Sequence, residues 1–402
     1  MTILESFRAR PLPLANLVAD WGRGARYAGS KDRAFVRGLC LDALRRWRSF
    51  GGEASPRRAV LLTLRETWRW DDERIAAAFS GEHGPGALAA DEADAAPTAD
   101  PDLPEWLLAE FSDPIRASQA LSARAPVDLR VNTLKADREK ALKALKMLDA
   151  EPSPLSPIGV RIAPPASAEK GPGVTVIPAY GKGWIEVQDE GSQLTVLAAG
   201  PVRGLQVLDY CAGAGGKTLA LAAEMQNSGQ VFAYDQDAHR LAPIHERLRR
   251  AGARNVQVIA PSDPERLVDL QGKMDVVFVD APCSGAGTWR RHPDAKWRLT
   301  PEHLQQRLSE QDQVLDEASA YVAPGGMLVF VTCSFLRSEN DDRVSGFLER
   351  RADFQHIDPL ENAVPSVHEA LSGFVSDGAL RLTPWTSETD GFTLIAVRRQ
   401  HS

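Results

Sequence analysis

From about residue 203 onward, short apolar segments alternate with longer segments of helical periodicity, and this alternation restricts the possible folds strongly. The apolar segments are rich in Val, Ile, Leu and Phe and cover 205–209, 230–235, 256–259, 275–280 and 327–332. The helical segments between them cover 216–225, 237–252 and 300–322. Strands that alternate with helices form a parallel sheet with helices on both faces. We therefore predict an α/β domain with a doubly wound, mostly parallel sheet over 201–402.

The chain before this domain has a different organisation. Residues 1–80 show apolar positions at a spacing of three to four, which predicts a helical domain. The segment 81–102 is rich in Gly, Ala, Pro and acids and reads as an acidic linker. We predict a small α+β module over 103–200, in which 174–178 is a further strand. Near the end of the chain, 379–399 predicts two strands at an antiparallel edge of the large sheet.

Composition excludes several classes of protein. The chain has 402 residues, of which 25% are charged, and no apolar run approaches the roughly 20 residues that span a bilayer. The N-terminus lacks a secretory layout, and none of the four cysteines forms a CxxC pair. These features predict a cytoplasmic protein with reduced thiols and no membrane or metal partner. Cys40 lies on an apolar helix face, where we expect a core residue.

The charge distribution permits a nucleic-acid partner although the net charge is −7. Residues 1–58 hold 12 Lys and Arg against 5 acids, and 116–146 hold 8 against 3. The acidic stretch 82–110 between them has 8 acids and no Lys or Arg. Phosphate contacts require local positive charge, although basic faces are also common as plain solvated surface.

A glycine-rich turn directly follows the first strand of the predicted sheet. It reads DYCAGAGGKT over 209–218, and its glycines permit a tight turn before a helix N-terminus. A phosphate-binding P-loop requires Gly where Cys211 stands, and a dinucleotide fingerprint requires Gly where Thr218 stands. The turn therefore predicts a site for another ligand that contains a nucleoside.

Carboxylates follow the next strands at the edge where such sheets bind ligands. Asp235 lies 22 residues after Gly213 and is placed to accept hydrogen bonds from ribose hydroxyls. This arrangement fits NAD and S-adenosylmethionine equally. Asp237 is expected to cap the following helix. Asp280 ends the fourth strand, where a Walker-B role is also open but is weakened by the failed P-loop.

Two cysteines follow neighbouring strands, Cys283 in a Pro-Cys turn and Cys333 in a Thr-Cys-Ser turn. A polar, partly open turn suits a reactive thiolate better than a passive core thiol. Methylation at carbon 5 of a pyrimidine requires such a set of groups. A thiolate adds to carbon 6, an acid stabilises charge near N3, and a base later removes the proton on carbon 5. The loop after Cys283 contains basic and aromatic side chains that we expect to hold phosphates and stack bases, namely Trp289, Arg290, Arg291, His292, Lys296, Trp297 and Arg298.

Several segments together resemble the signature motifs of the RsmB/NSUN family of RNA 5-methylcytosine methyltransferases. The segments are 209–218, 280–297 and 331–341, with flanking similarity at 186–194 and 389–399, so the resemblance covers roughly 103–400. The N-terminal helices also resemble the NusB-like RNA-binding domain of bacterial members. One departure is that Ala214 replaces the usual Pro of the glycine-rich turn. The resemblance implies a class I Rossmann-like methyltransferase fold with a seven-stranded sheet, after an RNA-binding α+β module and the helical domain.

The resemblance also implies a role for each matching residue. Cys333 is the nucleophile, Cys283 assists product release, and Asp280 contacts the cytosine beside Lys217. Asp263 is the expected contact to adenine, although the alignment there can slip by one residue. Cys211 fits the motif and is expected to be structural. The residues implied to hold S-adenosylmethionine are Cys211, Ala212, Gly213, Ala214, Gly215, Gly216, Lys217, Asp235, Asp263 and Asp280.

The function implied is methyl transfer from S-adenosylmethionine to cytosine in RNA, through a covalent cysteine–carbon 6 adduct. The expected partner is ribosomal RNA, with transfer RNA as an alternative, and we expect a monomer. Two other functions remain open. A DNA cytosine methyltransferase uses the Pro-Cys thiol, here Cys283, as its nucleophile. A catalytically inactive RNA-binding factor for ribosome assembly could also retain this fold.

Overall fold

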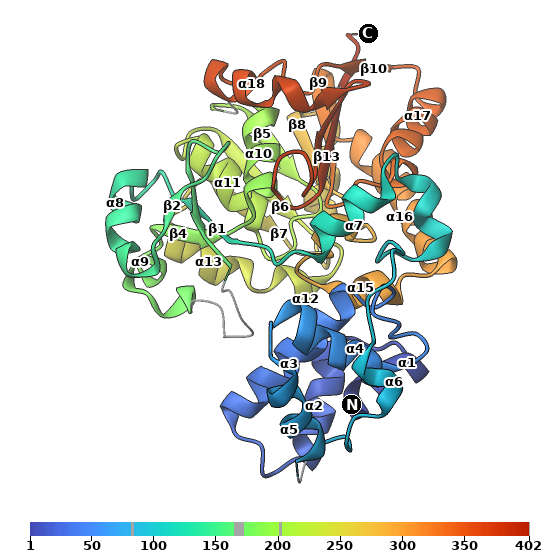
Figure 1. Ribbon diagram of the computed structural model, residues 1–402. Coiled ribbons are helices and arrows are strands. Elements are labelled where there is room, and N and C mark those ends of the chain that lie inside the picture. Colours follow the sequence, from blue (N-terminus) through green and yellow to red (C-terminus); the bar gives the residue numbers. More distant parts are fainter. Residues whose placement is uncertain (82–83, 165–172, 201–202, 402) are drawn as a thin grey trace. The chain divides into compact units, whose positions relative to one another are not determined.

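The computed structural model describes residues 1–81, 84–164, 173–200 and 203–401, which divide into two compact units (Figure 1). The first unit contains Met1–Ala125 and Trp289–Thr300, and the second contains the described residues of Pro126–Ala163, Pro172–Thr288 and Pro301–Ser402. These units cross the boundaries predicted at 80, 102 and 200. No helix in the described part of the chain is long and apolar enough to cross a membrane.

The first unit is helical, as the apolar spacing predicts. Its core includes Leu4, Phe7, Leu44 and Phe50, and Cys40 is 4% exposed among them, which confirms the prediction of a core thiol. Burial raises the pKa of the Cys40 thiol to about 12. The α-helices of this unit are α1 (Thr2–Ala9), α2 (Leu14–Gly24), α3 (Ser30–Arg45), α4 (Pro56–Leu62), α5 (Asp72–Ser80), α6 (Ala90–Ala93), α7 (Pro114–Ser122) and α15 (Pro293–Arg298).

The acidic segment 81–102 is bound to this helical unit, so its described residues do not form the flexible linker that the composition predicted. Glu92 forms an ion pair with Arg57 at 2.6 Å. Asp102 is 4% exposed and accepts a hydrogen bond from the Ser49 hydroxyl at 2.8 Å. The acids of the segment therefore find partners on the preceding basic helices, and this pairing keeps the segment on their surface.

The second unit begins with a small antiparallel sheet in the order β2-β3-β1-β4. Its strands are β1 (Val127–Val131), β2 (Glu151–Pro152), β3 (Gly159–Ile162) and β4 (Ile185–Val187), with α8 (Arg138–Ala144) beside them. The predicted strand over 174–178 is wrong. Val174–Val176 form a 3-10 turn, because Pro178 opens the short helix α9 (Pro178–Gly181) and has no N–H to donate to a ladder.

The large sheet of the second unit confirms the predicted α/β class. Parallel pairs join β5 to β6 and β8, β6 to β7, and β8 to β9, and β13 runs antiparallel to β9. The described sheet has nine strands instead of the expected seven. β10 and β12 pair with successive parts of one edge of β13, and the two-residue strand β11 pairs with β12. The strands are β5 (Gln206–Asp209), β6 (Gln230–Tyr234), β7 (Val256–Ile259), β8 (Met274–Asp280), β9 (Val322–Thr332), β10 (Phe354–Ile357), β11 (Val375–Ser376), β12 (Ala379–Leu382) and β13 (Phe392–Arg399).

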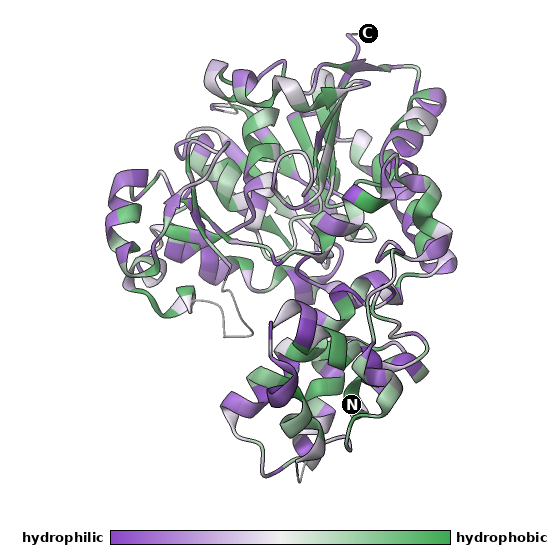
Figure 2. Cartoon of the chain, in the orientation of Figure 1, coloured by the Kyte–Doolittle hydropathy of each residue, from purple (hydrophilic) through white to green (hydrophobic). Residues whose placement is uncertain are grey.

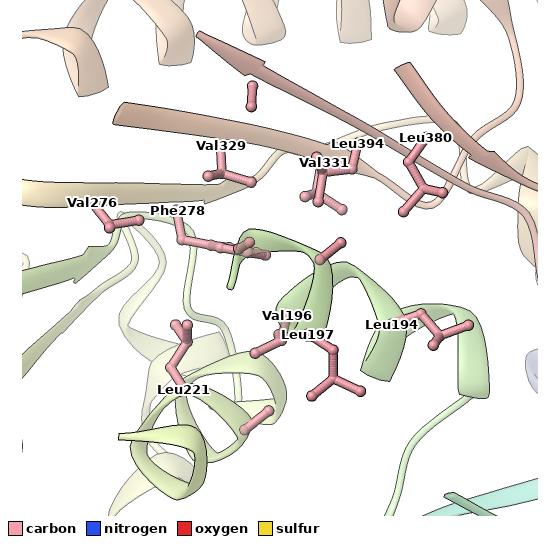
Figure 3. Packing of buried hydrophobic residues seen from close by; sticks show 14 of the residues in the cluster. Leu194, Val196, Leu197, Leu221, Val276, Phe278, Val329, Val331, Leu380 and Leu394 are labelled. Atoms are coloured by element: carbon pink, nitrogen blue, oxygen red, sulfur yellow. The ribbon is translucent and has the colours of Figure 1, made fainter. Parts of the chain in front are cut away.

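Helices cover both faces of the large sheet, since its strands are apolar on both sides (Figure 2). On one face, Val276 and Phe278 of β8 pack with α10 (Glu190–Ala199) and α11 (Gly216–Glu224), as Figure 3 shows. On the other face, Val277 and Val279 pack with α16 (Pro301–Ser319) and α17 (Asp341–Arg350). Leu194 and Val196 of α10 thus belong to the core of the large sheet, although the sequence assigned this helix to the preceding module.

Candidate active site

The residues singled out in the sequence meet at the carboxyl ends of the parallel strands. β5 leads into the glycine-rich turn, β6 ends before Asp235, β8 ends at Asp280, and β9 ends one residue before Cys333. The ladder places Asp280 opposite Val331, so the turns after β8 and β9 leave the sheet at the same edge. This arrangement is the ligand-binding edge of an open α/β sheet.

The glycine-rich turn adopts backbone conformations that require glycine. Gly213 has φ +49° and Gly215 has φ +84°. A Cβ on Gly215 would come within 2.5 Å of Cγ1 of Ile244, so no larger residue fits there without displacement. A Cβ built on Gly216, where α11 begins, meets no described residue within 4 Å apart from its chain neighbours and the backbone of its own helix, so there is space beside this helix N-terminus.

Asp235 fixes this turn from the neighbouring strand. Its side chain is 2% exposed, and Oδ2 accepts a hydrogen bond from the Gly213 N–H at 2.9 Å. Oδ1 accepts from the Asp237 N–H at 2.9 Å. Asp237 caps α12 (Ala238–Leu241), as predicted, by accepting the His239 and Arg240 N–H groups. Asp235 therefore shapes the turn in addition to offering lone pairs to a ligand.

A pocket beside the turn has aromatic and carboxylate walls. Tyr210 stands at one wall, where its hydroxyl donates to Glu317 at 2.8 Å. Burial raises the pKa of the neighbouring Cys211 thiol well above its usual value, as do Asp209 and Asp235, so this thiol is not a reactive thiolate. The walls of the pocket include Tyr210, Tyr234, Asp235, Arg240, Pro282 and Glu317.

Two acids near this pocket differ from the sequence expectation. Asp209 was not singled out from the sequence as a site residue, although Asp209 ends a strand as Asp280 does. Its side chain is fully buried, Oδ2 accepts from Thr218 at 2.6 Å, and Oδ1 has no hydrogen-bond partner among the described residues. Burial raises the pKa of Asp209 to about 7. Asp263 does not line the pocket and lies 3.8 Å from Arg266, so its contact to adenine stays a prediction.

A lysine–aspartate pair lies between the glycine-rich turn and β8. Lys217 Nζ is 2.6 Å from Asp280 Oδ2, and the lysine is 8% exposed while the Asp280 side chain is 33% exposed. The Phe392 ring lies 5.2 Å from the same ammonium group. The partly exposed aspartate can therefore offer its second oxygen to a ligand while the lysine supplies a nearby positive charge.

The two predicted cysteines are in direct contact. Cys283 Sγ lies 3.3 Å from Cys333 Sγ, which is hydrogen-bond distance for sulfur. The hydrogen bond with Cys333 raises the pKa of Cys283 well above its usual value, and burial and the Glu339 charge act in the same direction. Two sulfur groups that can act as nucleophiles are thus placed side by side after the ends of β8 and β9.

Several side chains of the basic loop after Cys283, which the sequence predicts to contact RNA, are instead buried or paired within the helical unit. Trp289 is fully buried, and Lys296 is 1% exposed with Nζ donating to the Arg45 carbonyl at 3.2 Å. Trp297 Nε1 donates to the Leu44 carbonyl at 2.6 Å, and Arg298 pairs with Asp294 at 3.3 Å. The loop packs on α3 of the helical unit, since its aromatic rings and lysine stem are largely apolar.

The second predicted basic segment is only partly accessible. Arg130 is 1% exposed, so its guanidinium is not accessible to a phosphate at the surface. Lys135, Lys140 and Lys146 are exposed, and Lys140 Nζ lies 4.0 Å from the ring centre of Trp184. The described residues contain no group of three or more potential ligands arranged for a metal ion.

Comparison with known proteins identifies the family of this arrangement. Residues 196–398 match the family model for 16S rRNA methyltransferase RsmB/F. A ribosomal RNA small subunit methyltransferase B from Photorhabdus laumondii is 37% identical over 62% of this chain and 58% of its own length. The chain thus spans less than two thirds of the length of that relative.

Solved structures share the fold. The crystal structure of PH0851 superposes with a TM-score of 0.72 at 22% identity and covers 99% of this chain and 98% of its own. NSun6 from Pyrococcus horikoshii, solved with SFG, has a TM-score of 0.61 at 21% identity and covers 74% of this chain and 97% of its own. The motif resemblance noted in the sequence is confirmed, and the chain belongs to the 16S rRNA methyltransferase RsmB/F family.

Proposed function

We propose that this chain methylates carbon 5 of cytosine in RNA, with S-adenosylmethionine as the methyl donor and ribosomal RNA as the substrate, transfer RNA being the alternative. The observation that carries the proposal is the contact between the Cys283 and Cys333 thiols beside the Lys217–Asp280 pair. The curated relatives are named rRNA methyltransferases, which supports the choice of ribosomal RNA. We also propose that the protein acts in the cytoplasm as a monomer.

In the proposed reaction, the Cys333 thiolate attacks carbon 6 of the cytosine and forms a sulfur–carbon bond. The electron pair of the carbon 5–carbon 6 double bond then becomes nucleophilic at carbon 5. S-adenosylmethionine supplies an electrophilic methyl group to that carbon when it is bound. Asp280 contacts the edge of the base, and the Lys217 ammonium, 2.6 Å from Asp280, stabilises the charge that develops on the ring.

Release of the product requires a base that removes the proton from carbon 5. The electron pair of that C–H bond re-forms the ring double bond, and the bond from carbon 6 to Cys333 breaks. Cys283 lies 3.3 Å from the departing sulfur, so it is placed to assist this step. Its raised pKa favours the thiol over the thiolate, which argues against Cys283 as the attacking group.

The chain's own residues fit the proposed cofactor. The glycine-rich turn permits close approach of backbone, and Asp235 is placed beside the pocket with both oxygens oriented by backbone N–H groups. Asp209 lies buried at the end of the neighbouring strand β5, and its Oδ1 has no hydrogen-bond partner among the described residues. These features support a nucleoside with a charged tail, as in S-adenosylmethionine.

A denaturing gel tests the division of labour between the thiols. We expect Cys283→Ser to form the covalent bond to RNA and to release it slowly, so that a protein–RNA adduct survives denaturation. Adding Cys333→Ala should abolish the adduct. An adduct from Cys333→Ala alone, and none from Cys283→Ser, would instead support the DNA-type mechanism.

Calorimetry separates the enzyme from the assembly factor. The proposal expects the wild-type protein to bind S-adenosylmethionine, and Cys333→Ala to bind it equally well. A wild-type protein that binds RNA but no S-adenosylmethionine would support a catalytically inactive factor. Bisulfite sequencing of ribosomal and transfer RNA from a deletion strain would then identify the modified cytosine.

A further inference from the structure

Two consecutive side chains that the proposed mechanism does not use lie fully buried beside the thiols. Glu339 and Asn340 are each 0% exposed. They follow Cys333 by six and seven residues, where the short turn Arg337–Glu339 leads from β9 into α17. A buried acid and a buried amide require hydrogen-bond partners, so their partners indicate what they hold in place.

Glu339 binds the turn that carries Cys283. Its Oε1 accepts the Ser284 N–H at 2.7 Å, and its Oε2 accepts the Ser284 hydroxyl at 2.5 Å. Gln311 of α16 donates to the same carboxyl group at 3.2 Å and to the Pro282 carbonyl at 2.9 Å. The residues on both sides of Cys283 are thus fixed by one carboxyl group and its amide neighbour.

Asn340 binds the turn that carries Cys333. Its Oδ1 accepts the Thr332 hydroxyl at 2.7 Å, and its Nδ2 donates to the Ser334 carbonyl at 3.2 Å. The same Nδ2 also donates to the Leu336 carbonyl at 2.7 Å. The residues on both sides of Cys333 are therefore fixed by the amide next to Glu339 in the chain.

We propose that Glu339 is a positioning residue that holds the Cys283 turn against the Cys333 turn, so that Cys283 reaches the bond broken during product release. The inference rests on the proposed function. Asn340 is the next residue in the chain, so the Cys283 turn and the Cys333 turn are held by two side chains that are one peptide bond apart. The contact between the thiols therefore depends on both Glu339 and Asn340. Removal of the Glu339 side chain frees the Cys283 turn while the Asn340 bonds still hold Cys333.

The charge of Glu339 adds an electrostatic effect. It raises the pKa of Cys283, together with the hydrogen bond to Cys333 and burial. Glutamine at position 339 retains the shape, since its carbonyl accepts the Ser284 N–H and its amide donates to the Ser284 hydroxyl. Position and charge can therefore be separated by substitution.

Glu339→Ala should slow release more than attack. We expect turnover to fall by about 100-fold, because a misplaced group of this kind loses most of its effect, while the Kd for S-adenosylmethionine is unchanged. The covalent protein–RNA adduct should accumulate on a denaturing gel, as with Cys283→Ser. Ser284→Ala, which removes only one bond to Glu339, should give a weaker form of the same result and serves if Glu339→Ala does not fold.

Glu339→Gln should rescue most of the turnover and release the adduct. The acidic limb of its pH profile for release should move to lower pH, because Cys283 loses a neighbouring negative charge. A merely structural residue would leave the pH profile in place. An unchanged profile in Glu339→Gln, together with no adduct in Glu339→Ala or Ser284→Ala, would overturn the inference.

Glu190 provides a matched control in the same unit. It is also 0% exposed and accepts two backbone N–H groups, from Leu155 and Ser156, each at 2.7 Å. Glu190→Gln should lower the melting temperature, and no covalent protein–RNA adduct should accumulate in this variant. If Cys283→Ser itself gives no adduct, the proposed function fails, whereas an adduct from Cys283→Ser but none from Glu339→Ala or Ser284→Ala refutes only the inference.

Discussion

The segment that follows β8 contains two halves with opposite environments. Residues 280–284 lie at the candidate site of the second unit, where Asp280 pairs with Lys217 and Cys283 contacts Cys333. Residues 289–298 belong to the first unit, where Lys296 is buried and hydrogen-bonded to the Arg45 carbonyl. Both halves contain residues that sequence reasoning assigned to RNA or to chemistry, and only the first half lies at the candidate site.

The difference shows which kind of sequence signal is reliable. Asp280 and Cys283 follow directly from the end of a strand, and the edge of a parallel sheet fixes where strand ends meet. The basic loop was assigned from side-chain type alone. A loop with many charged and aromatic residues can either contact phosphates or be buried in the protein, because lysine and tryptophan both carry large apolar surfaces.

The largest contrast between the halves is expected in the chemistry. Cys333→Ala should reduce methyl transfer by at least about 10³-fold, since no other group replaces the attacking thiolate. Lys296→Met, in the other half of the comparison, should keep turnover within about tenfold of wild type, because it leaves the cleft unchanged. Methyl transfer from labelled S-adenosylmethionine measures both. Equal decreases would place the buried loop in the active site.

A smaller effect is expected on cofactor affinity. Asp235→Ala should weaken S-adenosylmethionine binding by about 1–3 kcal/mol, because it removes both a partner for the ribose and the bond to the Gly213 N–H. Asp237→Ala is the matched control, since it removes only a helix cap and should affect stability instead. Calorimetric titration distinguishes the two. Identical affinities in both variants would refute the pocket assignment.

RNA binding should distinguish exposed from buried basic residues. Lys140→Ala and Lys146→Ala should each flatten the log–log slope of RNA affinity against salt by about 0.7–0.9, because a protein with one phosphate-binding lysine fewer displaces fewer counterions from the RNA. Lys296→Met should leave the slope unchanged, since Lys296 is 1% exposed. Filter binding from low to moderate salt measures the slopes. A change of slope in Lys296→Met alone would support the prediction that the loop 289–298 contacts RNA.

The smallest effect concerns stability against pH. Burial lowers the pKa of Lys296 from 10.5 to about 7, an effect that Asp102 opposes and Arg45 reinforces. Between about pH 7 and 10.5 the unfolded chain binds more protons at this group, so its contribution to stability rises with pH. Lys296→Met should remove this rise relative to wild type in thermal unfolding. Lys146→Met, which replaces an exposed lysine, should retain the rise of stability with pH. Loss of the rise in Lys146→Met would contradict the argument from burial.

The strands and the glycine-rich turn could be predicted because their signals are local. Residues 205–209 and 275–280 are short, mainly apolar segments that end in Asp, and the glycines at 213 and 215 meet the positive φ that the turn requires. Local rules fail for α10, which looked like part of the small module. This helix is buried on every side, and only the assembled sheet shows which core it enters.

The sequence by itself therefore determined the parallel sheet and the edge at which Asp235, Asp280, Cys283 and Cys333 meet, because strand direction and strand ends follow from local pattern. The tertiary structure alone decided which charged side chains are buried. Lys296 lies beside α3 and near Asp102, and Glu339 reaches Ser284 across 55 residues of chain. Burial is a property of neighbours brought together by folding, and no spacing along one segment contains that information.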